Sequence, residues 1–415
     1  MPYQLMNQDK CLLDFICRRN EFEEVECVEL QWHSPLRPIG FTDLTAFLER
    51  RKAPKHRANI AELLHKYGCE DLEGFLLITH ALSLNDTFWV KTADSTLTWA
   101  DVSLYQNAFD EVISRTAFDG TASSQSFSST SPEFGTDGTY AKCWVREGHN
   151  IYLYKTGSPL FEIEPLSEYL ASQLAAVLCP GAVQYDLAMH HGKLVSKCKL
   201  FTDEATGFAQ ANRIFRKAVS LPELLVYFES IGAGDRFRRI CVLDALIFNP
   251  DRHYGNFGVL FDTATMQITG MAPAFDYNKA LFTEVDDDAV QTLSWYAARC
   301  APRLGADFNV TANELLTPSI RADLKNLSGF CFTQHPRFHS SPARLSALSY
   351  LVNRQIDLIL QRVPVATASQ QKQYDFVESR SAVSVHTICA DAKDRAAELN
   401  GGQAPTAPAP ELDQN

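Results

Sequence analysis

The sequence predicts an α+β protein in which a small β-rich unit precedes a mostly helical unit, with an α-rich module in front of both. Two aromatic-rich segments with alternating apolar residues, 139–155 and 183–201, are typical of β-hairpins. One long amphipathic segment separates them, and beyond residue 203 apolar residues recur at helical spacing.

Apolar spacing defines the α-rich module at 1–92. The expected helices are 42–51, 59–67 and 72–82. In the first of them, Leu44, Phe47 and Leu48 share one face behind a threonine that can cap the helix. The segment 82–91 then turns into an extended, aromatic piece.

The β-rich unit is expected at 93–202. It begins with a loop and a short helix at 94–118, followed by a Ser/Gly-rich stretch at 119–138 that is either a linker or a mobile loop. Between the two hairpins, 164–178 predicts a strong helix, because Pro165 lies in its first turn and leucines form a stripe along it.

The helical unit is expected at 203–365. Its expected helices are 222–231, 235–248, 316–327 and 342–360, and short strands are expected at 259–261 and 267–269. Residues 366–415 are polar and end in a Gly/Pro/Ala-rich segment without core-forming residues, which predicts a disordered tail.

Composition excludes several classes of protein. Asp and Glu (50) outnumber Lys and Arg (38), and the resulting charge of −12 makes direct nucleic-acid binding through bulk charge unlikely. The eleven cysteines form no C-x-x-C pair, so neither a disulfide framework nor a zinc ribbon is expected. No signal peptide and no apolar run of membrane-spanning length is visible, so the expected location is the cytoplasm, away from the membrane.

The sharpest chemical signal is the segment 249–258, NPDRHYGNFG, together with Phe275-Asp276. Phosphoryl transfer needs a carboxylate that orients the acceptor and hard oxygen ligands for magnesium. Asp251 and Asn256 are five residues apart in a segment broken by proline and glycine. A short hairpin after it would return Asp276 to the same cleft. Arg252 could pair with a phosphate or with a nearby acid, and we expect the acid. We expect His253 to brace the loop rather than to act as a base.

Residues for the phosphates of ATP are expected upstream. Lys155 ends an apolar strand and needs a counter-ion there, for which Glu164 and Glu168 are candidates. Glu168 is preferred because it lies within the helix, one turn past Pro165. Gly135 and Gly138 precede the first hairpin, where their backbone amides could approach phosphate; an ordinary hairpin turn is the alternative.

Across 130–360 the chain resembles the HipA-like bacterial protein kinases, and its Asp-Arg-His order is distantly similar to phosphatidylinositol-kinase-related enzymes. The motifs are GTDGTYAKCW, YLYKTGS, EPLSEYLASQLA, VSKCKLF, NPDRHYGNFGVL and PAFD. The resemblance implies a bilobal protein-kinase-like fold, with ATP and Mg²⁺ as cofactors. By position, Asp251 would be the catalytic carboxylate, Asn256 and Asp276 would bind Mg²⁺, and Lys155 would bind the phosphates. Lys197, Cys198 and Lys199 would lie near the hinge that meets adenine.

The resemblance implies a kinase that phosphorylates Ser or Thr of a protein substrate that the sequence does not identify, with autophosphorylation as one form of this activity. An antitoxin or operon partner is an open alternative. The family pattern is not complete, because Tyr277-Asn278 follow Asp276 in place of Phe-Gly. Two alternative hypotheses of function stay open: a small-molecule or lipid kinase, and a nucleotide-binding regulatory protein without turnover.

Overall fold

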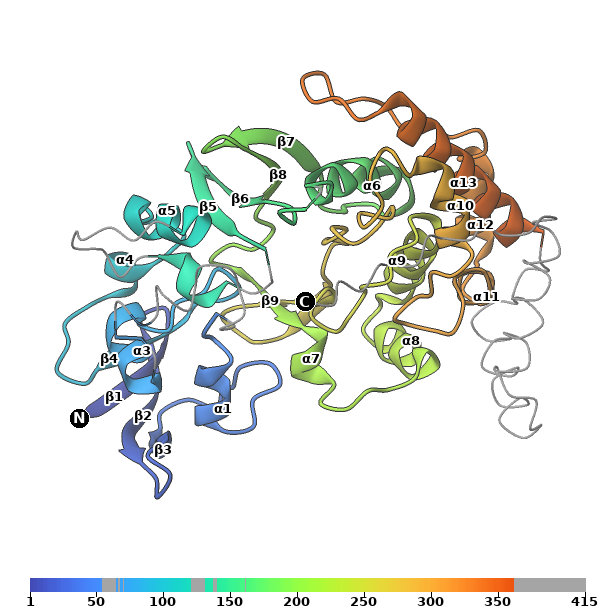
Figure 1. Cartoon of the computed structure of the whole chain (residues 1–415). Coiled ribbons are helices and arrows are strands. Elements are labelled where there is room, and N and C mark those ends of the chain that lie inside the picture. Colours follow the sequence, from blue (N-terminus) through green and yellow to red (C-terminus); the bar gives the residue numbers. More distant parts are fainter. Residues whose placement is uncertain are drawn as a thin grey trace. The chain divides into compact units, whose positions relative to one another are not determined.

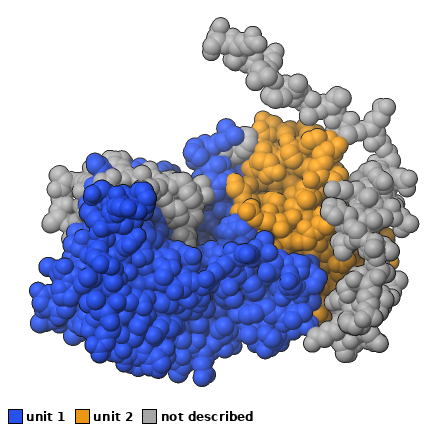
Figure 2. Space-filling view, turned by 90° about the horizontal axis from the view of Figure 1, so that it is seen from below, with its two compact units in different colours: residues 1–237, 253–278 blue, residues 238–252, 279–415 orange. Residues whose placement is uncertain are grey.

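The computed structural model describes residues 1–53, 65, 68–69, 71–120, 131–136, 140–160 and 162–361. In these residues the chain is mixed α/β, with three antiparallel sheets (Figure 1). It divides into two compact units, which Figure 2 colours separately. Unit 1 holds residues 1–237 and 253–278, and unit 2 holds 238–252 and the chain from 279 onwards. This division differs from the boundary expected near residue 203, and the two-lobed arrangement stays a prediction.

Residues 1–92 are built around a four-stranded sheet, so the expectation of an α-rich module was wrong. In spatial order the strands are β3 (Val25–Trp32), β2 (Lys10–Arg19), β1 (Pro2–Asn7) and β4 (Phe88–Thr92). Two expected helices are present as α1 (Leu44–Glu49) and α3 (Leu72–Thr79), each capped by an aspartate. The third expected helix, at 59–67, lies almost wholly outside the described residues.

The apolar pattern of these strands is not a clean alternation, which hides them in the sequence. β2 carries a bulge where it pairs with β1, so that Leu12 and Leu13 are neighbours and both fully buried. β3 lies at the edge of the sheet, and Val25 is its only buried residue. A strand that buries one side chain has too few apolar residues for a period-2 signal.

Hydrogen bonds join residues 1–92 to the rest of unit 1. The Asn7 side-chain amide donates to the Thr263 carbonyl over 2.7 Å, and the Phe208 N–H donates to the Asn85 carbonyl over 2.7 Å. The module at 1–92 is therefore packed into a larger unit rather than carried as a separate domain.

The second sheet has the strand order β5 (Lys142–Glu147), β6 (Asn150–Lys155), β8 (Lys193–Lys199), β7 (Tyr185–His190). It contains the two expected hairpins. The expected helix at 164–178 is α6 (Glu164–Leu178), which packs on β7 and β8. Before this sheet the chain forms α4 (Trp99–Val102), α5 (Glu111–Asp119) and a 3-10 helix, η1 (Pro132–Gly135). Most of the Ser/Gly-rich stretch lies outside the described residues.

The third sheet has the order β11 (Ile268–Met271), β10 (Gly258–Asp262), β9 (Thr206–Gln210). The expected strand pair is confirmed as β10 and β11, whereas β9 has no counterpart among the expected elements. Two helices follow β9, namely α7 (Ala211–Ile214) and α8 (Leu221–Ser230). Helix α9 (Gly234–Leu246) leads into the segment that carries the predicted catalytic residue.

Unit 2 is helical in its described part. After α9 its elements are η2 (Val290–Thr292), α10 (Leu293–Ala297), α11 (Phe308–Glu314), α12 (Pro318–Asn326) and α13 (Pro342–Leu360). Arg344 of α13 is buried and donates to the carbonyls of Leu281 and Val285, which fixes the segment after Asp276 to this helix. No helix among the described residues is long and apolar enough to cross a membrane. The expected tail at 366–415 lies outside the described residues.

Candidate active site

The ammonium group of Lys155 forms two ion pairs at the end of β6. Its Nζ lies 2.7 Å from Glu168 Oε1 and 2.7 Å from Asp276 Oδ1. The Lys155 and Glu168 side chains are 7% and 1% exposed, whereas that of Asp276 is 25% exposed. Three residues that the sequence singled out therefore meet in unit 1, and one of them opens to solvent.

Glu164, the other candidate partner of Lys155, binds other residues instead. Glu164 accepts hydrogen bonds from the Tyr140 hydroxyl over 2.9 Å and from the Ser158 backbone N–H over 2.9 Å. Glu164 therefore stabilises the turn that follows β6. The ion pair with Lys155 is formed by Glu168, which lies one turn further along α6.

Strand register and helix packing place these groups. Lys155 is paired with Ser196 across β6 and β8, and the Ser196 hydroxyl donates to Glu168 Oε2. Since α6 packs on β8, its buried face brings Glu168 to this pair of strands. Both oxygens of Glu168 are thus hydrogen-bonded, as a buried carboxylate requires. Sequence reasoning missed Ser196, because its role depends on the register of the sheet.

Two factors determine the electrostatics of Lys155, Glu168 and Asp276: their burial, and the presence of two carboxylates for one ammonium group. Burial alone would lower the pKa of Lys155, but the charges of Asp276 and Glu168 outweigh it, and the pKa lies above its ordinary value. Burial raises the pKa of Glu168, and the charge of Asp276 raises it further, against the attraction of Lys155. Two carboxylates share one cation, so the group has a formal excess of one negative charge.

Asp276 is held from both its backbone and its neighbours. Its φ of 59° is left-handed, which aspartate tolerates better than most residues, and its N–H donates to the Tyr185 hydroxyl over 3.0 Å. The ring of Phe275 packs with those of Phe201 and Phe208, at centroid distances of 5.6 Å each. Because this conformation is uncommon, the contacts on either side of Asp276 fix where its carboxylate lies.

Asn256 lies in the turn between α9 and β10 and is buried. Its N–H donates to the His253 carbonyl over 2.8 Å, and the Gly255 N–H donates to the His253 ring Nδ1 over 3.0 Å. The expectation that His253 braces this loop is confirmed. A Cβ at Gly258 would lie 2.1 Å from the Ala209 carbonyl oxygen, so the close pairing of β10 with β9 requires glycine at that position.

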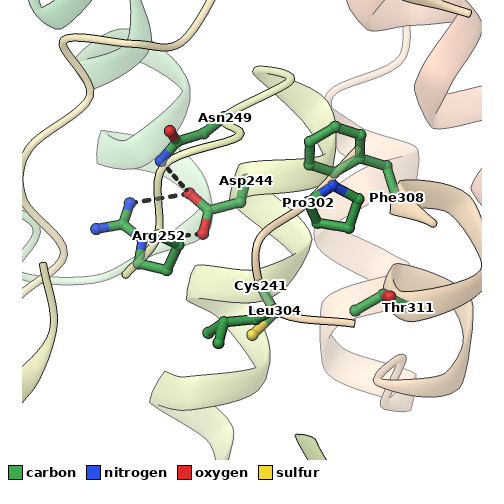
Figure 3. A pocket seen from close by; sticks show the side chains of 8 residues that line it. All are labelled: Cys241, Asp244, Asn249, Arg252, Pro302, Leu304, Phe308 and Thr311. Atoms are coloured by element: carbon green, nitrogen blue, oxygen red, sulfur yellow. Dashed lines mark hydrogen bonds and ion pairs between the residues drawn. The ribbon is translucent and has the colours of Figure 1, made fainter. Parts of the chain in front are cut away.

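Asp251 belongs to unit 2. Its backbone is held by a buried network whose side chains, Asp244, Asn249 and Arg252, are drawn in Figure 3. The Nε and Nη2 of Arg252 donate to the two carboxylate oxygens of Asp244, each over 2.9 Å. The Asn249 side-chain amide donates to Asp244 over 2.9 Å, and its oxygen accepts the Asp251 N–H over 3.1 Å. Asp244 therefore positions the main chain at Asp251 through Asn249.

The expectation that Arg252 pairs with a nearby acid is thus confirmed, and Arg252 is 1% exposed. Asp244 was not singled out in the sequence, and Asn249 was named only as the first residue of the segment 249–258, without a role. A signal for Asp244 was present, because a lone carboxylate in the apolar run ICVLDALIF needs a buried partner. A small cavity beside this network is lined by Cys241, Pro302, Leu304, Phe308 and Thr311 (Figure 3).

Other predicted residues lie elsewhere. Gly135 ends η1, where a Cβ would lie 3.0 Å from the Arg51 carbonyl oxygen and 3.1 Å from that of Leu82. Close packing against the first 92 residues thus explains this glycine without a phosphate, and its phosphate role stays a prediction. Gly138 lies outside the described residues.

The three predicted hinge residues end β8. The Lys197 ammonium lies 2.6 Å from Glu147, and Lys199 is exposed. Cys198 is buried, and burial, reinforced by the charge of Glu168, raises the pKa of its thiol to about 12. The Lys197 side chain is therefore engaged in an ion pair with Glu147. A contact between Lys197 and adenine would have to come from the backbone of Lys197.

The chain matches a number of solved structures, among them two of low sequence identity. The Helicobacter pylori proinflammatory kinase CtkA is 19% identical, with a TM-score of 0.41, over 53% of this chain and 93% of that one. HipA of Shewanella oneidensis, solved with HipB and operator DNA, is 12% identical, with a TM-score of 0.46, over 97% of this chain and 100% of that one. One of the two matched structures is thus described as a kinase and the other as a HipA protein. No protein-family profile and no curated protein matches the chain.

Proposed function

We propose that the chain is a HipA-like, ATP-dependent kinase that transfers a phosphoryl group to Ser or Thr of a protein. The observation that carries the proposal is the position of Lys155 between Glu168 and Asp276, at 2.7 Å from each. A buried ion pair of this kind is costly to build, so its presence favours a role beyond stability. In kinases a lysine held by a helix glutamate meets the ATP phosphates beside a magnesium-binding aspartate.

The donor set fits Mg²⁺ and ATP. Asp276 and Asn256 offer hard oxygen ligands, and the carboxylate of Asp276 is partly exposed while one of its oxygens contacts Lys155. The excess negative charge of the Lys155 group favours a further cation. When bound, Mg²⁺ would neutralise charge on the transferred phosphoryl group. Lys155 would orient the phosphates, and Glu168 would hold Lys155 in place.

Asp251 is proposed as the catalytic carboxylate, which would accept the proton of the attacking hydroxyl. Its support within unit 2 is the chain of hydrogen bonds from Arg252 through Asp244 and Asn249. A main chain held in this way supplies the fixed orientation that phosphoryl transfer needs. Gly135, Gly138 and residues Lys197–Lys199 complete the proposed nucleotide site.

The alternatives are a small-molecule or lipid kinase and a nucleotide-binding regulator without turnover. A HipB-like partner belongs to the same proposal, because the HipA match was solved together with HipB.

The test is incubation of the full chain with Mg²⁺ and ATP labelled in its γ-phosphoryl group, with cell extract as the source of acceptors. Products are separated by gel for proteins and by thin-layer chromatography for small molecules. Label on Ser or Thr of a protein supports the proposal. Label only on a small molecule or lipid replaces it with the first alternative, and nucleotide binding without transfer replaces it with the second.

A further inference from the structure

We propose a metal site on the first sheet, built from Cys11, Asp14 and His33 and suited to a zinc-class transition metal. It is independent of the proposed kinase site, because it lies on the strands of residues 1–33. Among the described residues, these three are the group of His, Cys, Asp and Glu side chains whose ligand atoms all lie within 4.8 Å of one another.

The bulge in β2 creates this cluster. In a regular strand, residues three apart point to opposite faces, so Cys11 and Asp14 would not meet. The register between β1 and β2 skips Leu12, and both Leu12 and Leu13 turn into the same core. Their neighbours on either side, Cys11 and Asp14, therefore share the other face.

The neighbouring strands complete the site. His33 follows β3, and its N–H donates to the Leu12 carbonyl over 2.8 Å, which brings its ring beside the bulge. His33 Nε2 lies 2.7 Å from Asp14 Oδ2, and Cys11 Sγ lies 3.9 Å from Asp14 Oδ1. On the far side, Gln4 of β1 donates to Asp14 Oδ1 over 3.0 Å. Asp14 is thus oriented by a second residue, as metal-binding carboxylates are.

The donor chemistry selects the ion. One thiol, one imidazole and one carboxylate are ligands that Zn²⁺ accepts together, whereas Mg²⁺ and Ca²⁺ prefer oxygen alone. Three protein ligands leave a fourth position for water. Cys11 packs against the core around Met6 and Trp89, while His33 is exposed, so the ion would enter from the His33 side. On binding, the thiol proton of Cys11 leaves to solvent and the thiolate sulfur takes its place at the metal.

The test uses the full chain without nucleotide, in a phosphine-containing reducing buffer, titrated with Co²⁺ and with Zn²⁺. Cobalt bound to a thiolate gives a near-ultraviolet charge-transfer band, which an oxygen-only magnesium site cannot produce. We expect one Co²⁺ per chain with this band, displacement by Zn²⁺, and a higher thermal midpoint with Zn²⁺. Cys11→Ser should abolish the band, and His33→Gln should weaken metal binding at least about tenfold.

Cys17→Ser is the matched control, because Cys17 lies on the same strand and its thiol contacts the thiol of Cys27. It should bind cobalt as the wild type does. Urea unfolding of the metal-free variants separates lost binding from lost folding. The proposal is overturned if the folded wild type gives no thiolate band, or if the band survives Cys11→Ser.

Discussion

Lys155 and Asp276 lie 121 residues apart in the sequence, and their side chains meet at 2.7 Å. The contact joins the end of β6 to the segment that follows β11. Glu168 completes the group from α6, and its side chain is 1% exposed. Burial makes each partner of this group costly to remove, and the proposed chemistry of unit 1 rests on the same contacts.

Removing the lysine should destabilise the chain strongly. Lys155→Met leaves the buried Glu168 carboxylate beside Asp276 without a cation, and loss of one partner of a buried pair costs about 3–5 kcal/mol. The double variant Lys155→Met/Glu168→Leu removes the unpaired charge and should recover a large part of that loss. Urea unfolding of both variants measures the difference.

Lys10→Met is the control for this pair, because Lys10 is exposed and its variant should stay within about 0.5 kcal/mol of the wild type. A double variant as unstable as Lys155→Met alone would contradict the account, since the loss would then not come from an uncompensated carboxylate.

Asn249 should act on turnover rather than on nucleotide affinity. Asn249→Ala removes the acceptor for the Asp251 N–H and one partner of Asp244. A misplaced catalytic group can lower a rate about a hundredfold, so we expect kcat to fall by about that factor with little change in the KM for ATP. The exposed Asn326→Ala is the control and should leave both constants unchanged. A rise in KM with unchanged kcat would show that Asn249 does not position the catalytic group.

His190 should make the chain less stable in acid. Its ring packs against Phe118 and Tyr154, and burial, with a smaller effect of the His191 charge, lowers its pKa against the opposing charge of Asp119. The unfolded chain then takes up a proton at higher pH than the folded chain does. Stability is therefore complete above about pH 6.5, the ordinary histidine value, and falls as the pH drops through it.

The measurement is the thermal midpoint at about pH 7.5 and about pH 5.5, on either side of the ordinary histidine pKa. The thermal midpoint of His190→Gln should fall less between the two pH values than that of the wild type. His339→Gln, at an exposed site, should behave as the wild type does. Equal losses in all three proteins would mean that His190 is not the titrating group.

Cys17 and Cys27 should cross-link under oxidation. They face each other on β2 and β3, with their Sγ atoms 3.9 Å apart. With oxidised glutathione, the two thiols become one disulfide and two reduced glutathione molecules leave. The link should stabilise the chain by about 2–3 kcal/mol. Peptide mass spectrometry detects it, and the exposed Cys331 should carry mixed glutathione instead. Mixed disulfides alone at Cys17 and Cys27 would contradict the prediction.

Local pattern was sufficient for the long amphipathic helices. The expected segments 164–178 and 342–360 coincide with α6 and α13, because many residues of each repeat one apolar face. The local pattern was insufficient for β1, β2 and β3, where a bulge and a polar edge strand remove the alternation of apolar and polar residues. A short strand such as β9 is defined by its partners rather than by its own five residues.

In the candidate site, too, some features follow from local sequence and others depend on the tertiary structure. The contact of Lys155 with Glu168 followed from the need of a buried ammonium for a counter-ion, which is a local argument. The roles of Ser196 and Tyr185 depend on strand register and on the path of the chain at Asp276, which no local pattern contains.

The most direct test of the account compares phosphoryl transfer by the wild type, Asp276→Asn and Asp94→Asn, with Mg²⁺ and γ-labelled ATP. Asp94 is exposed on a turn and has no proposed role, so its variant controls for the chemical change itself. The account predicts labelled phosphoserine or phosphothreonine with the wild type and Asp94→Asn, and a loss of at least about a hundredfold with Asp276→Asn. Transfer by Asp276→Asn at the wild-type rate would contradict the assignment of this carboxylate to the metal, and with it the central claim.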